Sequence, residues 1–163
     1  MLTFEQFQTN VQEWSIARGI YEHSTALAQA LKAVSEVGEL ADATIKNDMG
    51  ALKDAIGDVA VCLVNVACMM RIEVDQQYIN LPINTEMKPN VSAALASRSV
   101  AGVASSIAVN FLPPVLIDEA FMYLYACALS NNLDFLDCCT AAWDEIKDRT
   151  GHMVAGGAFV KDE

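Results

Sequence analysis

The stretch SEVGELADATIKNDMGALKDAIGDVAVCLVNVA, residues 35–67, predicts two consecutive helices joined by a tight turn. Its apolar residues recur at helical spacing, and the Asn-Asp-Met-Gly segment supplies the turn. Two acidic pairs interrupt the apolar pattern, Glu36 with Glu39 and Asp54 with Asp58. Spacings of three and four residues put both members of a pair on one helix face. If the two helices pack antiparallel, we expect the four carboxylates to point toward one place.

Such a cluster of carboxylates favours a bound cation, because buried like charges repel one another and lose their hydration. With oxygen ligands only, the site suits Mg²⁺, and Mn²⁺ is a possible substitute. We therefore expect Glu36, Glu39, Asp54 and Asp58 to bind the metal. The apolar run after Asp58 predicts a buried helix with Asn65 on the same face as Asp58. For Asn65, an interhelical hydrogen bond and a substrate contact both stay open.

The rest of the chain also predicts helices and no strand. The expected helices are 3–18, 24–47, 51–72, 92–109, 114–130 and 133–149. Residues 75–92 are polar and contain two prolines, which is typical of a linker. We expect one all-α domain over residues 1–163. Its parts are a helical core at about 1–75, a linker at about 75–92, C-terminal helices at 93–150 and an extended tail at 151–163.

Composition narrows the classes of partner. The formal net charge is −11, and the ten basic residues are scattered singly, so nucleic acid and anionic membrane surfaces are unexpected partners. The five cysteines form no C-x-x-C motif and predict reduced core residues. The uncharged run 99–117 is broken by two prolines, so we expect no membrane span and no signal peptide. A cytoplasmic protein is the resulting expectation.

At this point the residues resemble a known family. The stretches SEVGELADATIKND and LKDAIGDVAVCLVNVA resemble the MazG-like, all-α nucleoside triphosphate pyrophosphohydrolases, a superfamily that includes the dimeric dUTPases. The family signature is E-E-x-x-E on one helix and E-x-x-D on the next. Ser35 replaces the first Glu, and Ala55 stands where the last motif has its Glu, with Asp54 one position earlier. The opening FQTNVQEWSIARGIYEH and the ending WDEIKDRTGHM resemble short MazG-like phage proteins.

The resemblance implies a helical bundle of the MazG-like or dimeric dUTPase type. The implied reaction is hydrolysis of an NTP or dNTP to the monophosphate and pyrophosphate. Glu36, Glu39 and Asp58 would be the catalytic residues, acting with Mg²⁺. The implied partners are a nucleoside triphosphate and further copies of the chain, as a homodimer or homotetramer. If the chain is phage-encoded, we expect it in the host cytoplasm.

Substrate contacts are expected from basic and aromatic residues, with Asn65 as a further candidate. Lys32 lies one turn before Glu36 on the same face, and Lys147 and Arg149 lie near the chain end, so all three are candidates for binding phosphates. Trp14 and His23 are candidates for the base pocket. Ordinary surface cations and core packing are the alternative interpretations of these residues.

Two other functions stay open. The altered signature acids are compatible with a catalytically weakened helical module that binds nucleotides or assembles. A carboxylate-bridged di-iron bundle also places acids on paired helices, but it needs E-x-x-H motifs, and the sequence contains none.

Overall fold

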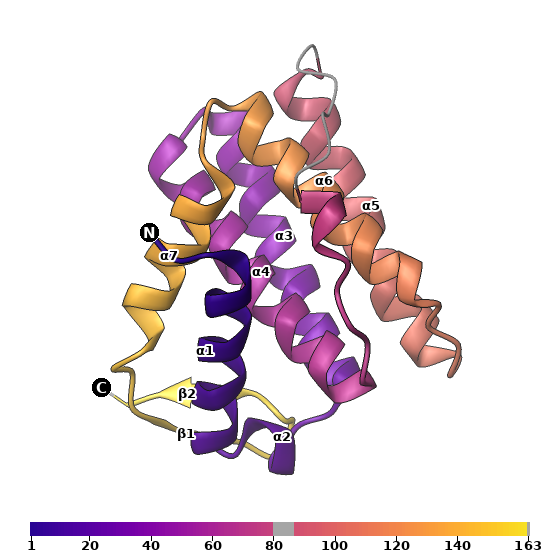
Figure 1. The fold of residues 1–163 in the computed structure, drawn as a ribbon, viewed down its shortest axis with the longest axis vertical. Coiled ribbons are helices and arrows are strands. Elements are labelled where there is room, and N and C mark those ends of the chain that lie inside the picture. Colours follow the sequence, from indigo (N-terminus) through magenta and orange to yellow (C-terminus); the bar gives the residue numbers. More distant parts are fainter. Residues whose placement is uncertain (80–86, 163) are drawn as a thin grey trace.

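The helix α4, Met49–Met70, is the centre of the fold (Figure 1). In the computed structural model, which describes residues 1–79 and 87–162, α4 packs against four other helices. Nearly every residue from Leu52 to Ala67 is buried. Because this helix is apolar on nearly all sides after Asp58, its burial there requires neighbours on all sides.

The observed elements confirm the predicted all-α class. The helices are α1 Phe4–Ala17, α2 Ile20–His23, α3 Ala26–Lys46, α4 Met49–Met70, α5 Pro89–Ala108, α6 Pro114–Ser130 and α7 Phe135–Ile146, with a 3₁₀ helix η1 at Gln76–Ile79. Two short strands, β1 Gly151–Met153 and β2 Phe159–Lys161, complete the described chain.

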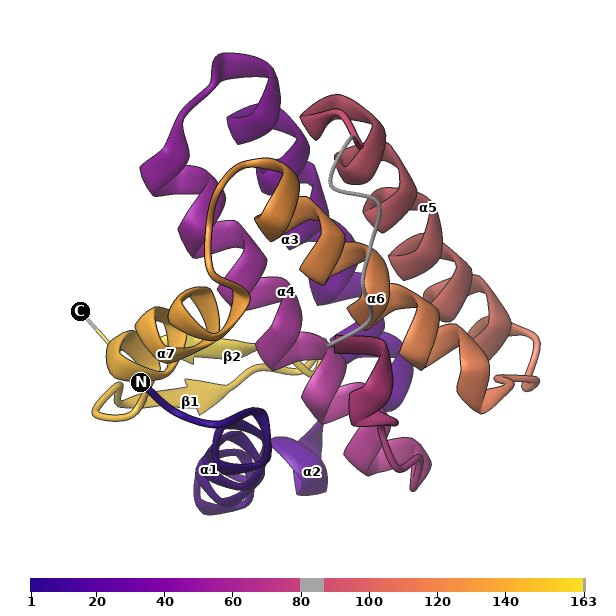
Figure 2. The same cartoon turned by 45° about the horizontal axis from the view of Figure 1, so that its top comes forward.

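The other helices form two groups, which pack on different sides of α4 (Figure 2). On one side α3 lies between α4 and α5, and α5 packs on α6. On the other side α1 and α7 pack against α4 and against each other. Gly57 allows the α4–α7 contact to be close, because a Cβ at this position would lie 2.6 Å from Ala142 Cβ and 2.6 Å from the Cys138 carbonyl oxygen.

Side-chain caps fix where α3 and α4 begin. Thr25 Oγ1 accepts a hydrogen bond of 3.1 Å from the Ala28 amide, and Asp48 does the same for Ala51 at 3.1 Å. Between α3 and α4, Asn47 adopts a left-handed conformation with φ 54°, which reverses the chain in two residues.

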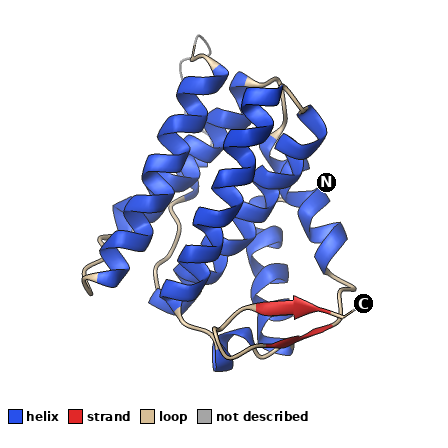
Figure 3. Cartoon of the chain, turned by 180° about the vertical axis from the view of Figure 1, so that it is seen from behind, coloured by secondary structure: helices blue, strands red, loops and turns tan. Residues whose placement is uncertain are grey.

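Three local features differ from the sequence prediction. The short helix α2 occupies a segment predicted as loop, and α7 ends at Ile146 rather than near residue 149. The tail forms an antiparallel hairpin, with His152 opposite Val160, across one end of the helices (Figure 3). Part of the predicted linker, residues 80–86, lies outside the described residues, and α5 begins at Pro89, inside the range predicted as linker.

Among the described helices, α5 is the one with the length and apolar composition to cross a membrane, judged on those two properties alone. Its buried stripe of small residues, which includes Ala96, Val100 and Val103, packs against α3 and α6.

Candidate functional site

A pocket of about 300 Å³ opens between α3, α4 and the C-terminal hairpin. The ends of α1, α2 and α7 complete its walls. Its lining combines carboxylates, cations and aromatic rings, which come from Lys32, Glu36, Asp58, Arg149, Trp14 and Phe159. Residues that are far apart in the sequence therefore meet at one cavity.

The two carboxylates of the pocket come from the two motif helices. Glu36 on α3 is only 4% exposed, and Asp58 on α4 is partly buried. Cys62 and Asn65 lie four and seven residues after Asp58, so helical spacing brings all three to the same wall of the pocket. The antiparallel arrangement expected from the sequence thus directs one acid of each pair into the cavity.

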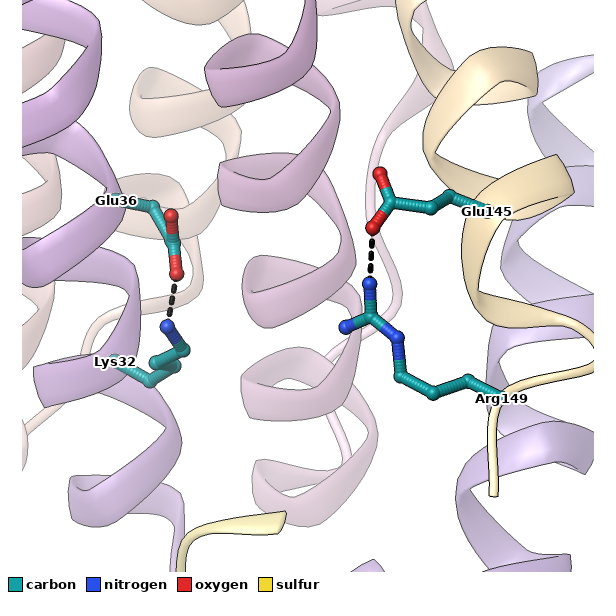
Figure 4. Close-up of polar contacts among 4 residues, drawn as sticks. All are labelled: Lys32, Glu36, Glu145 and Arg149. Atoms are coloured by element: carbon teal, nitrogen blue, oxygen red, sulfur yellow. Dashed lines mark hydrogen bonds and ion pairs between the residues drawn. The ribbon is translucent and has the colours of Figure 1, made fainter. Parts of the chain in front are cut away.

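Each basic side chain that lines the pocket forms an ion pair with a carboxylate one helical turn away (Figure 4). Lys32 forms an ion pair with Glu36, and Arg149 forms one with Glu145 at the end of α7. Both pairs have the i,i+4 spacing that places side chains side by side along a helix or its continuation. Asp58 has no such partner among the ion pairs of the described chain.

Electrostatics at Asp58 show an excess of negative charge. Burial raises the pKa of Asp58 from 3.8 to about 7, and the charges of Glu36, Glu145 and Asp54 add to the shift. Arg149 opposes it. At Lys32, burial works against the charged form, but the hydrogen bond and charge of Glu36 prevail and raise its pKa. The pocket is thus short of positive charge near Asp58.

The aromatic wall joins the first helix to the last strand. The rings of Trp14 and Phe159 are 5.5 Å apart and meet edge to face. The Arg18 guanidinium lies 5.3 Å from the centre of the Trp14 ring on α1. The buried indole nitrogen of Trp14 has no hydrogen-bond partner within the described residues. This wall offers flat apolar surface next to charged groups, which is the usual lining of a small-molecule site.

Asn65 belongs to a chain of hydrogen bonds that fastens the hairpin to the helices. Its side-chain oxygen accepts from Ser15 Oγ at 2.7 Å and from Tyr21 Oη at 3.0 Å, and its amide nitrogen donates to Gln29 Oε1 at 3.2 Å. Gln29 in turn donates to Ser24 Oγ at 3.1 Å. Ser24 Oγ donates to the Gly157 carbonyl at 2.6 Å. Asn65 lines the pocket, but its described hydrogen bonds are interhelical.

Four predicted site residues lie outside the pocket lining. Glu39 and Asp54 are exposed, one turn along the helix from Glu36 and Asp58 respectively. Lys147 is exposed and pairs with Asp144 at 2.6 Å. His23 lies in a separate hollow beside Arg18. In the part of the chain that the structure describes, no three or more His, Cys, Asp and Glu side chains are arranged to hold a metal ion.

Sequence reasoning missed three residues at or beside the pocket. Phe159 lies in a tail predicted to be extended, Gln29 is a polar residue in an apolar stripe, and Glu145 lies in the last helix. A buried Gln at a core-facing helical position is the one signal that the sequence offers for Gln29. No sequence pattern places Phe159 or Glu145 near the acidic motifs.

Comparison with known proteins gives one partial likeness. A protein of Haemophilus phage HP1 (strain HP1c1), described as an uncharacterized 18.2 kDa protein in the rep-hol intergenic region, is 34% identical to this chain over 73 residues. The match covers 45% of this chain and 45% of the phage protein, so it spans less than half of either. No family model and no solved structure matches the chain.

Proposed function

We propose that this protein is a metal-dependent nucleotide pyrophosphohydrolase, which converts an NTP or dNTP to the monophosphate and pyrophosphate. The observation that carries the proposal is that Glu36 and Asp58, from different helices, line one pocket together with Lys32 and Arg149. Paired acids beside cations are the groups that phosphoryl chemistry uses. The resemblance of the acidic helix pair to the MazG-like enzymes supports the same reaction.

The residues present fit a hard divalent cation that shares its ligands with a substrate. Mg²⁺ in nucleotide sites is commonly held by one or two carboxylates, with phosphates and waters as the other ligands. Glu36 and Asp58 supply two carboxylates. Burial, and after it the charges of neighbouring acids, raises the pKa of Asp58, so a cation beside it would stabilise its charged form. Glu39 and Asp54 remain candidates for outer contacts. When bound, the ion supplies charge neutralisation and a more acidic water.

The chain's own groups have distinct parts in this proposal. Lys32 and Arg149 bind the phosphate oxygens, since both line the cavity and both carry permanent charge at neutral pH. Trp14 and Phe159 provide the apolar surface against which the base packs. The pocket volume of about 300 Å³ is at the lower end for small-molecule sites, which favours one nucleotide over a larger ligand.

One observation favours a second candidate, a nucleotide-binding module without turnover. Ser35, which replaces the first signature acid, is exposed, and Glu39 and Asp54 are exposed as well. A pocket with two carboxylates retains the means to bind a metal–nucleotide pair, but it has fewer groups to activate water.

Self-association is a further part of the proposal, and the exposed face of α3 supports it. Leu31 is 57% exposed and Ile45 is 83% exposed, and they lie seven residues on either side of Gly38. Nothing lies within 4 Å of a Cβ built on Gly38. In an antiparallel pair of α3 helices centred on Gly38, each Leu31 would meet the other copy's Ile45, which is the self-complementary pattern of a twofold interface. Light scattering after size exclusion measures the mass that tests it.

The deciding experiment is pyrophosphate release from a panel of NTPs and dNTPs with Mg²⁺, with Mn²⁺ and with chelator. We expect monophosphate and pyrophosphate as products, only when metal is present. If the folded protein binds a nucleotide but turns over none, the second candidate replaces the first. If it neither binds nor hydrolyses any nucleotide, both candidates are wrong.

A further inference from the structure

The side chains proposed to bind the ligands are already engaged in ion pairs within the protein. Lys32 is paired with Glu36, and Arg149 is paired with Glu145 (Figure 4). Lys32, Glu36 and Arg149 all line the cavity. A group that is engaged in an internal ion pair is available to a ligand only after that pair is broken.

This arrangement sets up competition for each ligand taken singly. A divalent cation that approaches alone competes with the Lys32 ammonium for the Glu36 carboxylate. A phosphate that approaches alone competes with Glu36 for Lys32, and with Glu145 for Arg149. A phosphate that takes Lys32 alone leaves the Glu36 carboxylate, whose side chain is only 6% exposed, without a partner, and this is costly. Lys32 and Glu145 are exposed, so leaving either of them unpaired costs less.

The competition disappears when both ligands arrive. The phosphate oxygens take the two cations, and the released Glu36 carboxylate joins Asp58 in facing the metal ion. Glu145 lies outside the pocket lining and is exposed, so no buried charge is left without a partner.

We propose that the divalent cation and the nucleotide phosphates bind this pocket as a coupled pair, by exchange of the Lys32–Glu36 and Arg149–Glu145 ion pairs. The inference rests on the proposed function and adds its regulation: the metal site forms only when phosphate is present. Thermodynamic linkage makes the coupling reciprocal, so each ligand tightens the other by the same factor. For charge pairs in a partly buried pocket we expect about tenfold or more.

The test measures Mn²⁺ binding directly, without turnover. Free Mn²⁺ is followed by electron paramagnetic resonance during titration of the protein, alone and with each of dAMP, dCMP, dGMP and dTMP. Protein-free titrations correct for Mn²⁺ held by the nucleotide itself. In the native protein we expect the Kd for Mn²⁺ to fall by ~10-fold or more with at least one monophosphate.

Lys32→Met separates ion-pair exchange from general attraction between charges. It frees Glu36 permanently, so we expect Mn²⁺ to bind more tightly without nucleotide than it binds the native protein. We expect the added monophosphate to lower the Kd for Mn²⁺ by a smaller factor than in the native protein, because the direct contact between phosphate and ion and the Arg149–Glu145 exchange remain. Lys46→Met is the matched control, because Lys46 has the same i,i+4 ion pair with Asp42 on the same helix, outside the pocket. We expect it to leave the coupling unchanged.

The outcomes distinguish the inference from the function on which it rests. If the native protein hydrolyses nucleotides but its Kd for Mn²⁺ is the same with and without monophosphate, the inference is wrong and the function stands. If Lys32→Met and Lys46→Met raise the Mn²⁺ affinity equally, the effect is loss of charge rather than exchange, which also overturns it. If Mn²⁺ and nucleotides bind in no combination, the proposed function fails as well.

Discussion

The two sides of α3 bury polar groups in different ways. Toward α4, the partly or fully buried polar groups include the carboxylates of Glu36 and Asp58, which share a cavity. Toward α5 and α6, they include Ser92 and Asp118, which find hydrogen-bond partners on neighbouring elements. Ser92 Oγ lies 2.7 Å from Ser130 Oγ, and Asp118 accepts a hydrogen bond of 3.0 Å from the Asp75 amide.

This difference separates buried polar groups that only support packing from buried polar groups that form a candidate site. A buried polar group that is hydrogen-bonded to another part of the fold contributes to packing and needs no ligand. A carboxylate such as Asp58, which lines a cavity and whose pKa is raised by burial and by the charge of the neighbouring Glu36, is incompletely neutralised, and this is a feature of functional sites. The experiments below test this difference, from the largest expected effect to the smallest.

The largest contrast is expected in activity. Glu36→Gln and Asp58→Asn should each lower kcat/KM by about 10³-fold or more, roughly 4 kcal/mol, because each removes a charge that the reaction needs. Asp118→Asn changes a buried carboxylate on the other side and should stay within about threefold. Circular dichroism checks that the folds are intact. An unaltered rate in Glu36→Gln or Asp58→Asn removes that residue from the site.

Glu39 and Asp54, the exposed acids of the two motifs, provide an intermediate comparison for that experiment. Glu39→Gln and Asp54→Asn should reduce activity less than changes at Glu36 and Asp58, since their side chains lie outside the pocket lining. A loss as large as that of Asp58→Asn would show that the functional site extends one turn beyond the cavity.

The second contrast concerns helix packing around the pocket. Gly57→Ala should destabilise the fold by about 1–3 kcal/mol, because the added methyl would overlap Ala142 and the Cys138 carbonyl. Denaturation in urea measures it. The displacement of α7 should also move Arg149 and so lower the affinity for phosphate. Unchanged stability would mean that α7 shifts freely, which contradicts a fixed pocket wall.

The third contrast is in the pH dependence of stability. The pKa of Asp58 rises from 3.8 to about 7 on folding, mainly through burial. Between these values the folded chain binds more protons than the unfolded chain, so its stability falls as the pH rises from about 4 to about 7. Because Asp58 is partly exposed, the loss should be only about 1–2 kcal/mol.

Unfolding in chelator, followed from pH 4 to pH 8, measures this slope. Asp58→Asn should flatten it and leave the metal-free protein more stable than the native one at pH 8. Asp42→Asn, which changes an exposed carboxylate on α3, should keep the slope. Equal slopes in the native protein and Asp58→Asn would show that Asp58 is not the group that titrates.

The smallest contrast uses two glycines with open space around them. A Cβ at Gly102 in α5 or at Gly38 in α3 would meet nothing within 4 Å. Each change to Ala should therefore stabilise the fold by about 0.5–1 kcal/mol through helix propensity, measured as a rise in Tm. If the chain forms dimers through α3, Gly38→Ala should weaken them while Gly102→Ala does not.

The helical fold was predictable because its signals are local. The periodic apolar residues and the caps at Thr25 and Asp48 fix α3 and α4 within the chain itself. The hairpin was not predictable, since strands of three residues are too short to show alternation. Its position depends on distant contacts, such as that between Ser24 and Gly157.

The candidate site was predictable only in part, for the same reason. Helical spacing places Lys32 beside Glu36 and Asn65 along the helix from Asp58, and all four line the pocket. Spacing does not tell how far a helix is rotated about its axis against its neighbours. The sequence therefore could not show that Glu39 and Asp54 would face solvent, or that the end of α7 would lie near Asp58.

The hairpin of β1 and β2 bears on how long a bound molecule stays in the pocket rather than on how tightly it binds. It forms one wall of the pocket, yet it is held by two short strands, the Trp14–Phe159 contact and the bond from Ser24. Segments with so few buried contacts open without unfolding the helices, and such openings set the pace of release in many enzymes. The residence time of a bound molecule should therefore follow the opening rate of this hairpin, and its amides should exchange hydrogen faster than those of α4.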